Sequence, residues 1–195
     1  EIMKRIIKIL IILTITVAVI VIYLSIYGIK TEKFNNEIKK NVSKINKNIN
    51  LSLNEVNYLL NPLNFSINIS AKNPKILLED KSLDLSDITT NISLKSFINN
   101  QFSIDDLKIS TKEIQIKDLI SLTRKVKGSP QLFILDSITK AGLISANINL
   151  TFDLDGEIKK DYQINGTIKK AKFNIFNQAE IENLDLSFDI SKNQL

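Results

Sequence analysis

Three pairs of closely spaced carboxylates are the side chains in this 195-residue sequence best suited to acid–base chemistry. The pairs are Asp105 with Asp106, Asp153 with Asp155, and Glu180 with Glu182. Two carboxylates can serve as general acid and base, but acidic residues at strand ends usually form turns or solvated faces. We therefore expect these pairs to be structural and the protein to have no enzymatic activity.

The residue types that are missing narrow the chemistry further. The sequence has no His, Cys or Trp, which excludes disulfides, thiolate nucleophiles, Cys/His zinc sites and a histidine base. It also has no Gly-rich phosphate loop. The net charge of +5 is weak evidence for nucleic-acid binding, because a cluster of the basic residues flanks an apolar segment. We expect no cofactor, no metal and no nucleic-acid partner.

The apolar segment runs from Ile9 to Ile29 without a charged residue. As a helix rising about 1.5 Å per residue it spans roughly 30 Å, the thickness of a bilayer core. A buried core helix and a cleaved signal peptide are the alternatives, but the run is long for both and lacks a small-x-small cleavage site. Residues 1–30 are therefore predicted to be a single-pass membrane anchor. Its flanking basic residues are Lys4, Arg5, Lys8, Lys30 and Lys33.

The orientation of this anchor is left open by the charges. Counting basic residues within about 20 positions of the segment favours an intracellular location for the bulk of the chain. A short basic tail before a long apolar run is instead the usual layout of a signal anchor, which exports the rest of the chain.

Residues 31–50 are rich in Lys and Asn and carry apolar residues at steps of three and four. These are Phe34, Ile38, Val42, Ile45 and Ile49. The spacing predicts an amphipathic helix with a narrow apolar stripe, whose basic side could rest on anionic headgroups; a solvated stalk is the alternative.

From residue 51 onwards the period of the apolar residues changes to two. The longest run alternates Ile144, Ala146, Ile148, Leu150, Phe152 and Leu154 with polar residues, and the pattern continues at Tyr162, Ile164, Ile168, Phe173, Leu184, Leu186 and Phe188. Such alternation is typical of an antiparallel sheet with one apolar and one polar face. Residues 51–195 are predicted to form this sheet. The same residues would also fit the interior of a closed sandwich or barrel.

A helical insert is predicted at about 118–141. Asp118 to Lys125 forms one short helix, and Ser129-Pro130 begins a second as N-cap and first helical residue. Gly142 is expected to end the second helix. Its apolar residues Leu132, Phe133, Leu135 and Ile138 need a surface, and the end of the apolar sheet face is the expected one.

The turn at Asp155-Gly156 cannot be a two-residue hairpin loop, because that would place apolar residues of the two strands on opposite faces. A three-residue loop, with Gly156 in the left-handed conformation, keeps both apolar sets on one side. It predicts that Phe152 pairs with Ile158 and Ile148 with Tyr162.

Residues 147–154 are repeated 36 positions later at 183–190, with four identical positions. This indicates a hairpin repeat covering 147–182 and continuing from 183, although a biased composition could produce the same similarity. Arrays of this kind extend by adding units. We expect the sheet to continue beyond the present sequence.

This layout resembles the AsmA-like superfamily of bacterial envelope proteins, which includes the TamB and YhdP types. The resemblance lies in Phe102 to Ile109, in Ile114 to Leu119, and in the strand, Asp-Gly, strand, Gly segment from Gly142 to Ile168. It implies an inner-membrane anchor followed by a periplasmic, twisted, gutter-like sheet. In this family the concave apolar face carries lipid acyl chains towards the outer membrane.

The resulting functional hypothesis is phospholipid transport to, or biogenesis of, the outer membrane. Its partners are inner-membrane lipid and phospholipid acyl chains, and the alternating residues from Ile144 to Phe188 named above are the candidate groove. The alternative is a structural adaptor similar in plan to LptC, which docks to envelope proteins by adding strands at its open sheet edges.

Overall fold

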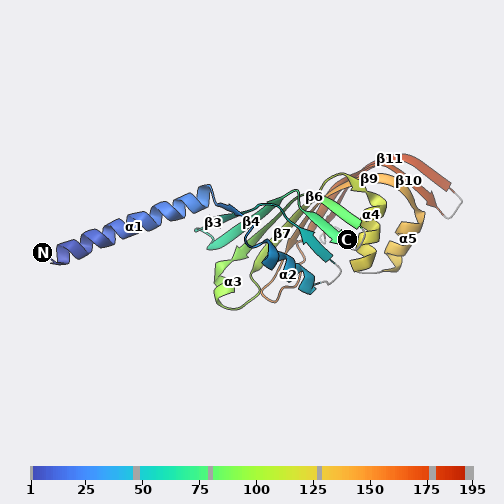
Figure 1. The fold of residues 1–195 in the computed structure, drawn as a ribbon. Coiled ribbons are helices and arrows are strands. Elements are labelled where there is room, and N and C mark those ends of the chain that lie inside the picture. The colour runs from blue at the N-terminus through green and yellow to red at the C-terminus, as the bar shows by residue number, and fades with distance from the viewer. Residues whose placement is uncertain (1, 46–48, 79–80, 127–128, 176–178, 192–195) are drawn as a thin grey trace.

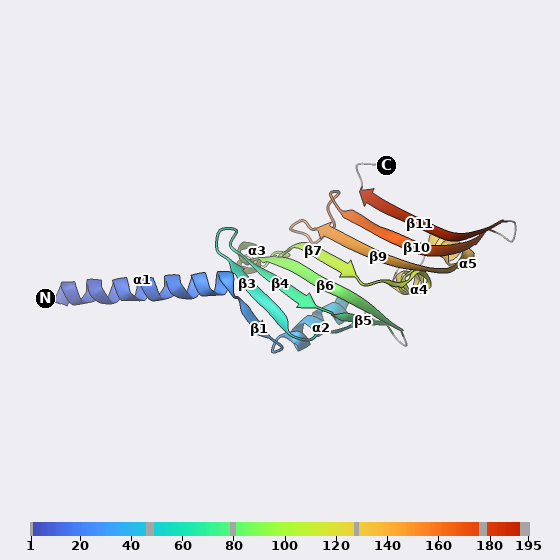
Figure 2. The same ribbon diagram turned by 90° about the horizontal axis from the view of Figure 1, so that it is seen from above.

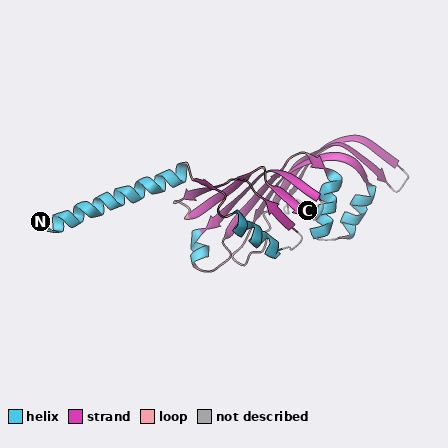
Figure 3. Cartoon of the chain, viewed as in Figure 1, coloured by secondary structure: helices cyan, strands magenta, loops and turns pink. Residues whose placement is uncertain are grey.

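The computed structural model describes residues 2–45, 49–78, 81–126, 129–175 and 179–191. A long helix projects from one end of a curved sheet, and the other helices lie beneath the sheet (Figure 1). Seen from above, the strands follow one another across a single layer (Figure 2). The chain is thus mainly antiparallel β-structure with an apolar N-terminal helix, as predicted (Figure 3).

The helices are α1 (Ile2–Ile26), α2 (Asn35–Ile45), α3 (Leu94–Ile98), α4 (Ile116–Val126) and α5 (Pro130–Ile138). The first six strands are β1 (Ile29–Thr31), β2 (Ile49–Ser52), β3 (Val56–Asn61), β4 (Ser66–Lys72), β5 (Lys75–Leu78) and β6 (Lys81–Ser93). The remaining strands are β7 (Ile104–Thr111), β8 (Ile114–Gln115), β9 (Thr139–Thr151), β10 (Gln163–Ile175) and β11 (Ala179–Ser191).

The main path of the sheet runs β1-β3-β4-β6-β7-β9-β10-β11, and every pair in it is antiparallel. Strands β2 and β5 extend from β6 as a side branch, and β8 pairs with β9. The outer strands β1 and β11 do not pair with each other, so the part of the sheet that the structure describes is open.

Cross-strand pairing separates the two faces of the sheet by polarity. One row across seven strands contains only apolar residues: Val56, Ala71, Ile88, Ile109, Ile148, Ile164 and Ile190. The adjacent row contains only polar ones: Asn57, Ser70, Thr89, Lys108, Asn149, Gln163 and Ser191. The period of two therefore predicted the faces correctly. Helices α2 and α4 pack on the apolar face.

Helix α1 is long and apolar enough to cross a bilayer, and none of its residues is buried. It ends at Ile26, so the prediction that the apolar helix runs on to Ile29 was wrong. Gly28 has a φ of +67°, and a Cβ there would lie 2.9 Å from the Asn57 side chain. The chain thus turns sharply at Gly28, and Ile29 pairs with Tyr58 as a strand residue.

Helix α2 lies on the N-terminal half of the apolar face. Ile38 packs against a buried cluster that includes Leu51 and Val56. The amide of Asn35 donates to the carbonyl oxygens of Leu53 and Asn54 over 3.3 and 2.7 Å. Of the two interpretations of residues 31–50, the amphipathic helix describes α2, while Thr31 and Ile49 belong to strands.

Helix α4 covers the C-terminal half of the same face. Its residues Ile116 and Ile120 are buried against Ile144 of β9 and Ala171 of β10. A short amphipathic helix can satisfy its apolar side in this way, so the first of the two predicted helices is present.

Helix α5 begins as predicted but ends differently. The Ser129 hydroxyl accepts from the backbone N–H of Leu132 at 3.2 Å, with Pro130 in the first turn. The helix ends at Ile138, so Gly142 does not terminate it. Gly142 lies inside β9 with a φ of +136°, where a Cβ would lie 2.9 Å from the Ala171 Cα. The strand needs a glycine there to pass close to β10.

The packing predicted for α5 is only partly correct. Leu132 and Ile138 are half-buried, whereas Phe133 and Leu135 are exposed. The Arg124 guanidinium lies 5.1 Å from the centre of the Phe133 ring and also pairs with Asp136. Helix α5 is therefore held mainly by α4 and by the ends of β9 and β10.

The β9–β10 connection confirms the predicted turn. Gly156 has a φ of +84° and Phe152 pairs with Ile158. The further pairing of Ile148 with Tyr162 was wrong, because Ile148 faces Ile164. Residues between Ile158 and Gln163 leave the ladder and shift the register by two positions. A shift of two leaves every side chain on its predicted face.

The first copy of the repeated segment begins in β9 and continues into the β9–β10 connection, and the second lies in β11, on the other side of β10. They are not level with each other, since Ile148 of the first copy shares a row with Ile190 through Ile164. The position equivalent to Ile148 in the second copy is Leu184, which pairs with Ala171 instead.

Candidate functional site

The carboxylate pairs all have structural partners. Asp105 and Asp106 are neighbours in β7, at an irregularity in its pairing with β6 where Asp106 faces Asn91 and Ile104 faces Ile92. Asp106 accepts a 2.6 Å hydrogen bond from the Asn91 amide, which itself accepts from Asn68 at 2.8 Å. Burial, with the negative charge of Asp106 as a lesser cause, raises the pKa of Asp105. Asp106 is therefore part of a structural hydrogen-bond chain with Asn91 and Asn68.

Of the other two pairs, Asp153 with Asp155 belongs to a turn, and Glu180 with Glu182 binds a lysine. The Asp153 carboxylate accepts from the backbone N–H groups of Asp155 and Glu157 at 3.0 and 2.9 Å. The Lys172 ammonium lies 2.9 Å from Glu180 and 2.5 Å from Glu182, and these partners raise the pKa of Lys172. Among the described residues, no cluster of three acidic side chains is arranged to hold a metal ion.

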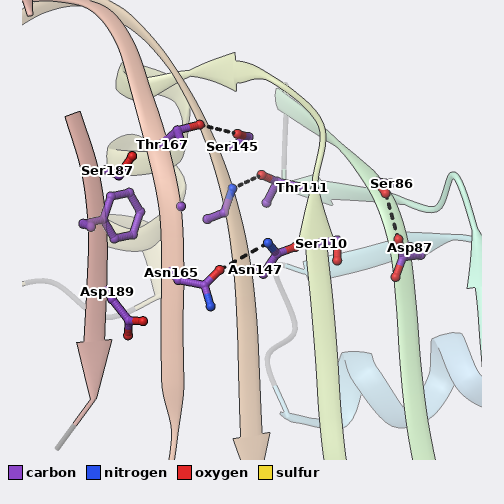
Figure 4. A pocket seen from close by; sticks show the side chains of 13 residues that line it. Ser86, Asp87, Ser110, Thr111, Ser145, Asn147, Asn165, Thr167, Ser187 and Asp189 are labelled. Carbon is purple, nitrogen blue, oxygen red and sulfur yellow. Dashed lines mark hydrogen bonds between the residues drawn. The ribbon is translucent and has the colours of Figure 1, made fainter. Parts of the chain in front are cut away.

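The polar face of the sheet contains a wide hollow of about 840 Å³ across β6, β7, β9, β10 and β11 (Figure 4). Its side chains largely bond to one another. The Ser145 and Thr167 hydroxyls are 3.0 Å apart, and the Asn147 amide donates to Asn165 at 3.3 Å (Figure 4). The Thr111 hydroxyl accepts from the backbone N–H of Ala146 at 2.8 Å. These bonds fit a solvated sheet surface.

The apolar face contains a smaller and more enclosed cavity of about 250 Å³, here called the furrow. It lies between the sheet on one side and α2 with the β2 region on the other. Its lining residues are Ile38, Leu51, Leu53, Val56, Ile69, Ala71, Ile88, Thr90, Ile92 and Ile104. The hydroxyl of Thr90 donates to the Asp106 carbonyl oxygen at 2.6 Å, so the single polar side chain in the lining is already satisfied.

Tyr58 packs against the same cluster and is titratable. Its ring meets Phe34 edge-on, with the ring centres 5.6 Å apart. Burial raises the pKa of the Tyr58 hydroxyl, with a lesser contribution from the Glu37 carboxylate. The hydroxyl has no hydrogen-bond partner among the described residues. The tyrosine is therefore neutral at ordinary pH, and none of the side chains that line the furrow is charged.

The furrow has the size and polarity to hold part of one hydrocarbon chain. Since a water molecule takes about 30 Å³ of liquid, its volume equals about eight waters. The volume of the furrow is just below the roughly 300–1,000 Å³ that is usual for small-molecule pockets. The walls of the furrow offer no polar partners to hold water.

The predicted groove residues lie on the same face but mostly outside the furrow. Five of them pack around α4 in a cluster with Ile116 and Ile120: Ile144, Ile168, Phe173, Leu184 and Phe188. Ala146 is buried, and Ile148, Leu150, Phe152, Tyr162, Ile164 and Leu186 are half-buried. Leu154, in the β9–β10 turn, is 56% exposed. The structure thus brings the predicted residues onto one face without joining them into one cavity.

The residues that do line the furrow were not among the predicted candidates. Ile69, Ile92 and Ile104 stand in recognisably alternating strands, whereas Leu51 and Leu53 lie in the short β2 region and the residue after it. The alternation of Leu51 and Leu53 was the available signal. Nothing local indicated that this segment would fold back over the sheet beside α2.

The predicted membrane-flanking residues lie at both ends of α1. Lys4, Arg5 and Lys8 are exposed in its first turns, Lys30 is exposed in β1, and Lys33 is exposed just before α2. Comparison of the chain with protein-family models, with curated proteins and with solved structures found no match.

Proposed function

We propose that the protein is a membrane-anchored, AsmA-like envelope protein whose apolar sheet face holds lipid acyl chains. In this role it supports phospholipid transport to, or biogenesis of, the outer membrane. The observation that carries the proposal is the furrow: a partly open cavity with an uncharged lining, on an open sheet attached to an apolar helix of membrane-spanning length.

The energetics favour an acyl chain as the ligand. Burial of a methylene group contributes about 0.8 kcal/mol, so a segment of about eight methylenes would gain on the order of 6 kcal/mol before the cost of immobilising it. The walls consist of aliphatic side chains such as Ile69, Ile88 and Ile104, which make no directional contacts and so impose little specificity. A loosely fitted apolar cavity suits a generic hydrocarbon better than a ligand with many polar groups.

The proposed location is the bacterial inner membrane, with α1 as a single span and the sheet in the periplasm. The support for export is the short basic start of α1, with Lys4, Arg5 and Lys8, before a long apolar run. The aromatic rings of Tyr23 and Tyr27, 5.2 Å apart near the end of α1, would lie at the outer interface of that membrane.

A second candidate function is that of a docking adaptor for envelope proteins. The observation favouring it is the outer edge of β11, a strand of 13 residues with which no other strand of the described chain pairs on that side. Such an edge offers a row of backbone groups for strand addition. The adaptor needs this edge, whereas lipid binding needs the furrow.

Site-specific photo-crosslinking in cells tests the primary function. A small diazirine-bearing amino acid at Ile88 would face the furrow, and one at the neighbouring Thr89 would face the polar side. We expect phospholipid adducts at position 88 and few at 89. A third reporter at Ile148 would test whether lipid also reaches the apolar face beyond the furrow. Protein adducts alone at position 88 would contradict the proposal.

A further inference from the structure

The end of the sheet beside α1 exposes a group of large apolar side chains. The β3–β4 turn carries Leu63, which is 95% exposed, and the half-exposed Phe65. Phe97 and Ile98 at the end of α3 are each 66% exposed. We call these four residues the rim. Scattered surface leucines need no explanation, but bulky apolar residues gathered at one end of a fold usually mark an interaction surface.

The parts of the rim are held next to each other and next to α1. The backbone N–H of Leu94, the first residue of α3, donates to the Phe65 carbonyl oxygen at 3.0 Å. Ser25 of α1 and Leu63 line one shared hollow on the surface. In both ribbon views the β3–β4 turn lies beside the end of α1, with α3 at the same end of the sheet (Figures 1 and 2).

The α3 part of the rim is also close to the furrow along the chain. Ile92, a furrow residue, stands two positions before α3, and Ile104, another, begins the strand that follows α3. These two residues are cross-strand partners. The α3 segment therefore joins two furrow-lining strands at the end of the sheet beside α1 (Figure 1).

The position of the rim decides between a bilayer and a protein as its occupant. If α1 spans a membrane, the level of Ser25 and Tyr27 is its interface, and Leu63 lies at that level. Exposed basic residues accompany the apolar ones, with Lys95 in α3 and Lys30 directly after α1. Apolar side chains with neighbouring lysines are typical of segments that lie in an anionic membrane interface.

We propose that the rim inserts into the leaflet from which α1 emerges and holds the adjoining end of the furrow against the bilayer. This inference rests on the proposed function, because it requires α1 to be a membrane span. It adds the place where lipid enters: an acyl chain would pass from the leaflet alongside the rim, without first crossing water.

Tryptophan fluorescence can test the rim, since the natural chain has no Trp. The full chain is reconstituted in vesicles of phosphatidylcholine and phosphatidylglycerol, with or without bromine on the acyl chains. The reporter is Phe97→Trp in α3, and the matched control is Phe133→Trp in α5, since the two phenylalanines are 66% and 62% exposed. Leu63→Trp is a second rim reporter at a position too exposed to disturb folding.

We expect the emission of Phe97→Trp and Leu63→Trp to shift to the blue and to fall severalfold with brominated lipid, while Phe133→Trp stays unquenched. Ile15→Trp, in the middle of α1, reports on the anchor itself. Quenching of Ile15→Trp without quenching of either rim reporter would overturn the rim and leave the anchor standing. No quenching of Ile15→Trp would overturn both. Equal quenching of Phe133→Trp would overturn the assignment to the rim, because the whole sheet would then lie on the membrane.

Discussion

Filling the furrow from within should displace the acyl chain. Ala71 of β4 lines the cavity, is almost fully buried and pairs directly with Ile88 of β6. The substitution Ala71→Ile adds three carbon atoms to the wall and removes the space for about three methylene groups of the ligand. At about 0.8 kcal/mol for each methylene, the loss is about 2.4 kcal/mol, or roughly 50-fold in affinity.

The pairing of Ala71 with Ile88 supplies a volume-matched control. The double variant Ala71→Ile with Ile88→Ala exchanges the two side chains across the same pair of strands and conserves their total volume. Volume-conserving exchanges in a core usually change stability by less than about 1.5 kcal/mol. We expect the double variant to regain most of the lost binding.

The assay is photo-crosslinking of the full chain in nanodiscs that contain a low fraction of a phospholipid with a diazirine in its acyl chain. At sub-saturating label the yield of adduct is proportional to affinity, so the ratio between variants can be compared directly with the expected change. Circular dichroism confirms that each variant is folded. Wild-type yield in Ala71→Ile would refute the reasoning. An equal loss in the single and double variants would also refute it, since the effect would then come from disturbed packing and not from lost volume.

Two further predictions concern stability, measured by thermal or urea unfolding of the full chain in detergent micelles. Burial raises the pKa of Asp105 above its ordinary 3.8, so the folded state binds this proton more tightly than the unfolded state does. The contribution of the protonated carboxyl to the free energy of unfolding is therefore present below pH 3.8 and is lost as the pH rises through the raised pKa. Asp105→Asn should therefore stabilise the protein at pH 7 and have little effect near pH 3, and a loss of stability at pH 7 would contradict this. At Gly166, an added Cβ would meet the Ser145 carbonyl oxygen and approach Phe188 to 2.7 Å, so Gly166→Ala should cost about 1–3 kcal/mol or more. The neighbouring Thr167→Ala removes one hydrogen bond and should cost about 1 kcal/mol, so an equal effect of the two would argue against the close approach.

The faces of the sheet could be predicted from the sequence because strand periodicity is local. Alternation alone put Ile148 and Ile164 on one side, and parity excluded the two-residue turn at Asp155-Gly156. The exact partner of Ile148 could not be predicted in the same way. It depends on how many residues after Ile158 leave the ladder, and a shift of two preserves the pattern from which the prediction was made.

The position of the furrow could not be predicted, because it depends on contacts between distant segments. Alternation describes Ile144 and Ile69 equally well, yet α4 covers Ile144 while Ile69 borders a cavity. The difference between covered and cavity-lining residues depends on where α2 and α4 pack on the sheet. The helical insert itself was visible in Ser129-Pro130, but the placement of Gly142 inside a strand reflects its close approach to Ala171, a contact between the neighbouring strands β9 and β10.

The charges of β11 bear on how the protein behaves when copies of it are crowded together. This strand contains Glu180, Glu182, Asp185 and Asp189 and no basic residue, while β10 beside it contains three lysines. Two copies that met along β11 would bring carboxylates against carboxylates, so β11 strands of two molecules repel each other. The backbone of β11 stays available for pairing with a strand that carries basic side chains. Fibre-like growth along this border is thereby opposed at low ionic strength. High salt, which screens charges over a few ångströms, should weaken that protection.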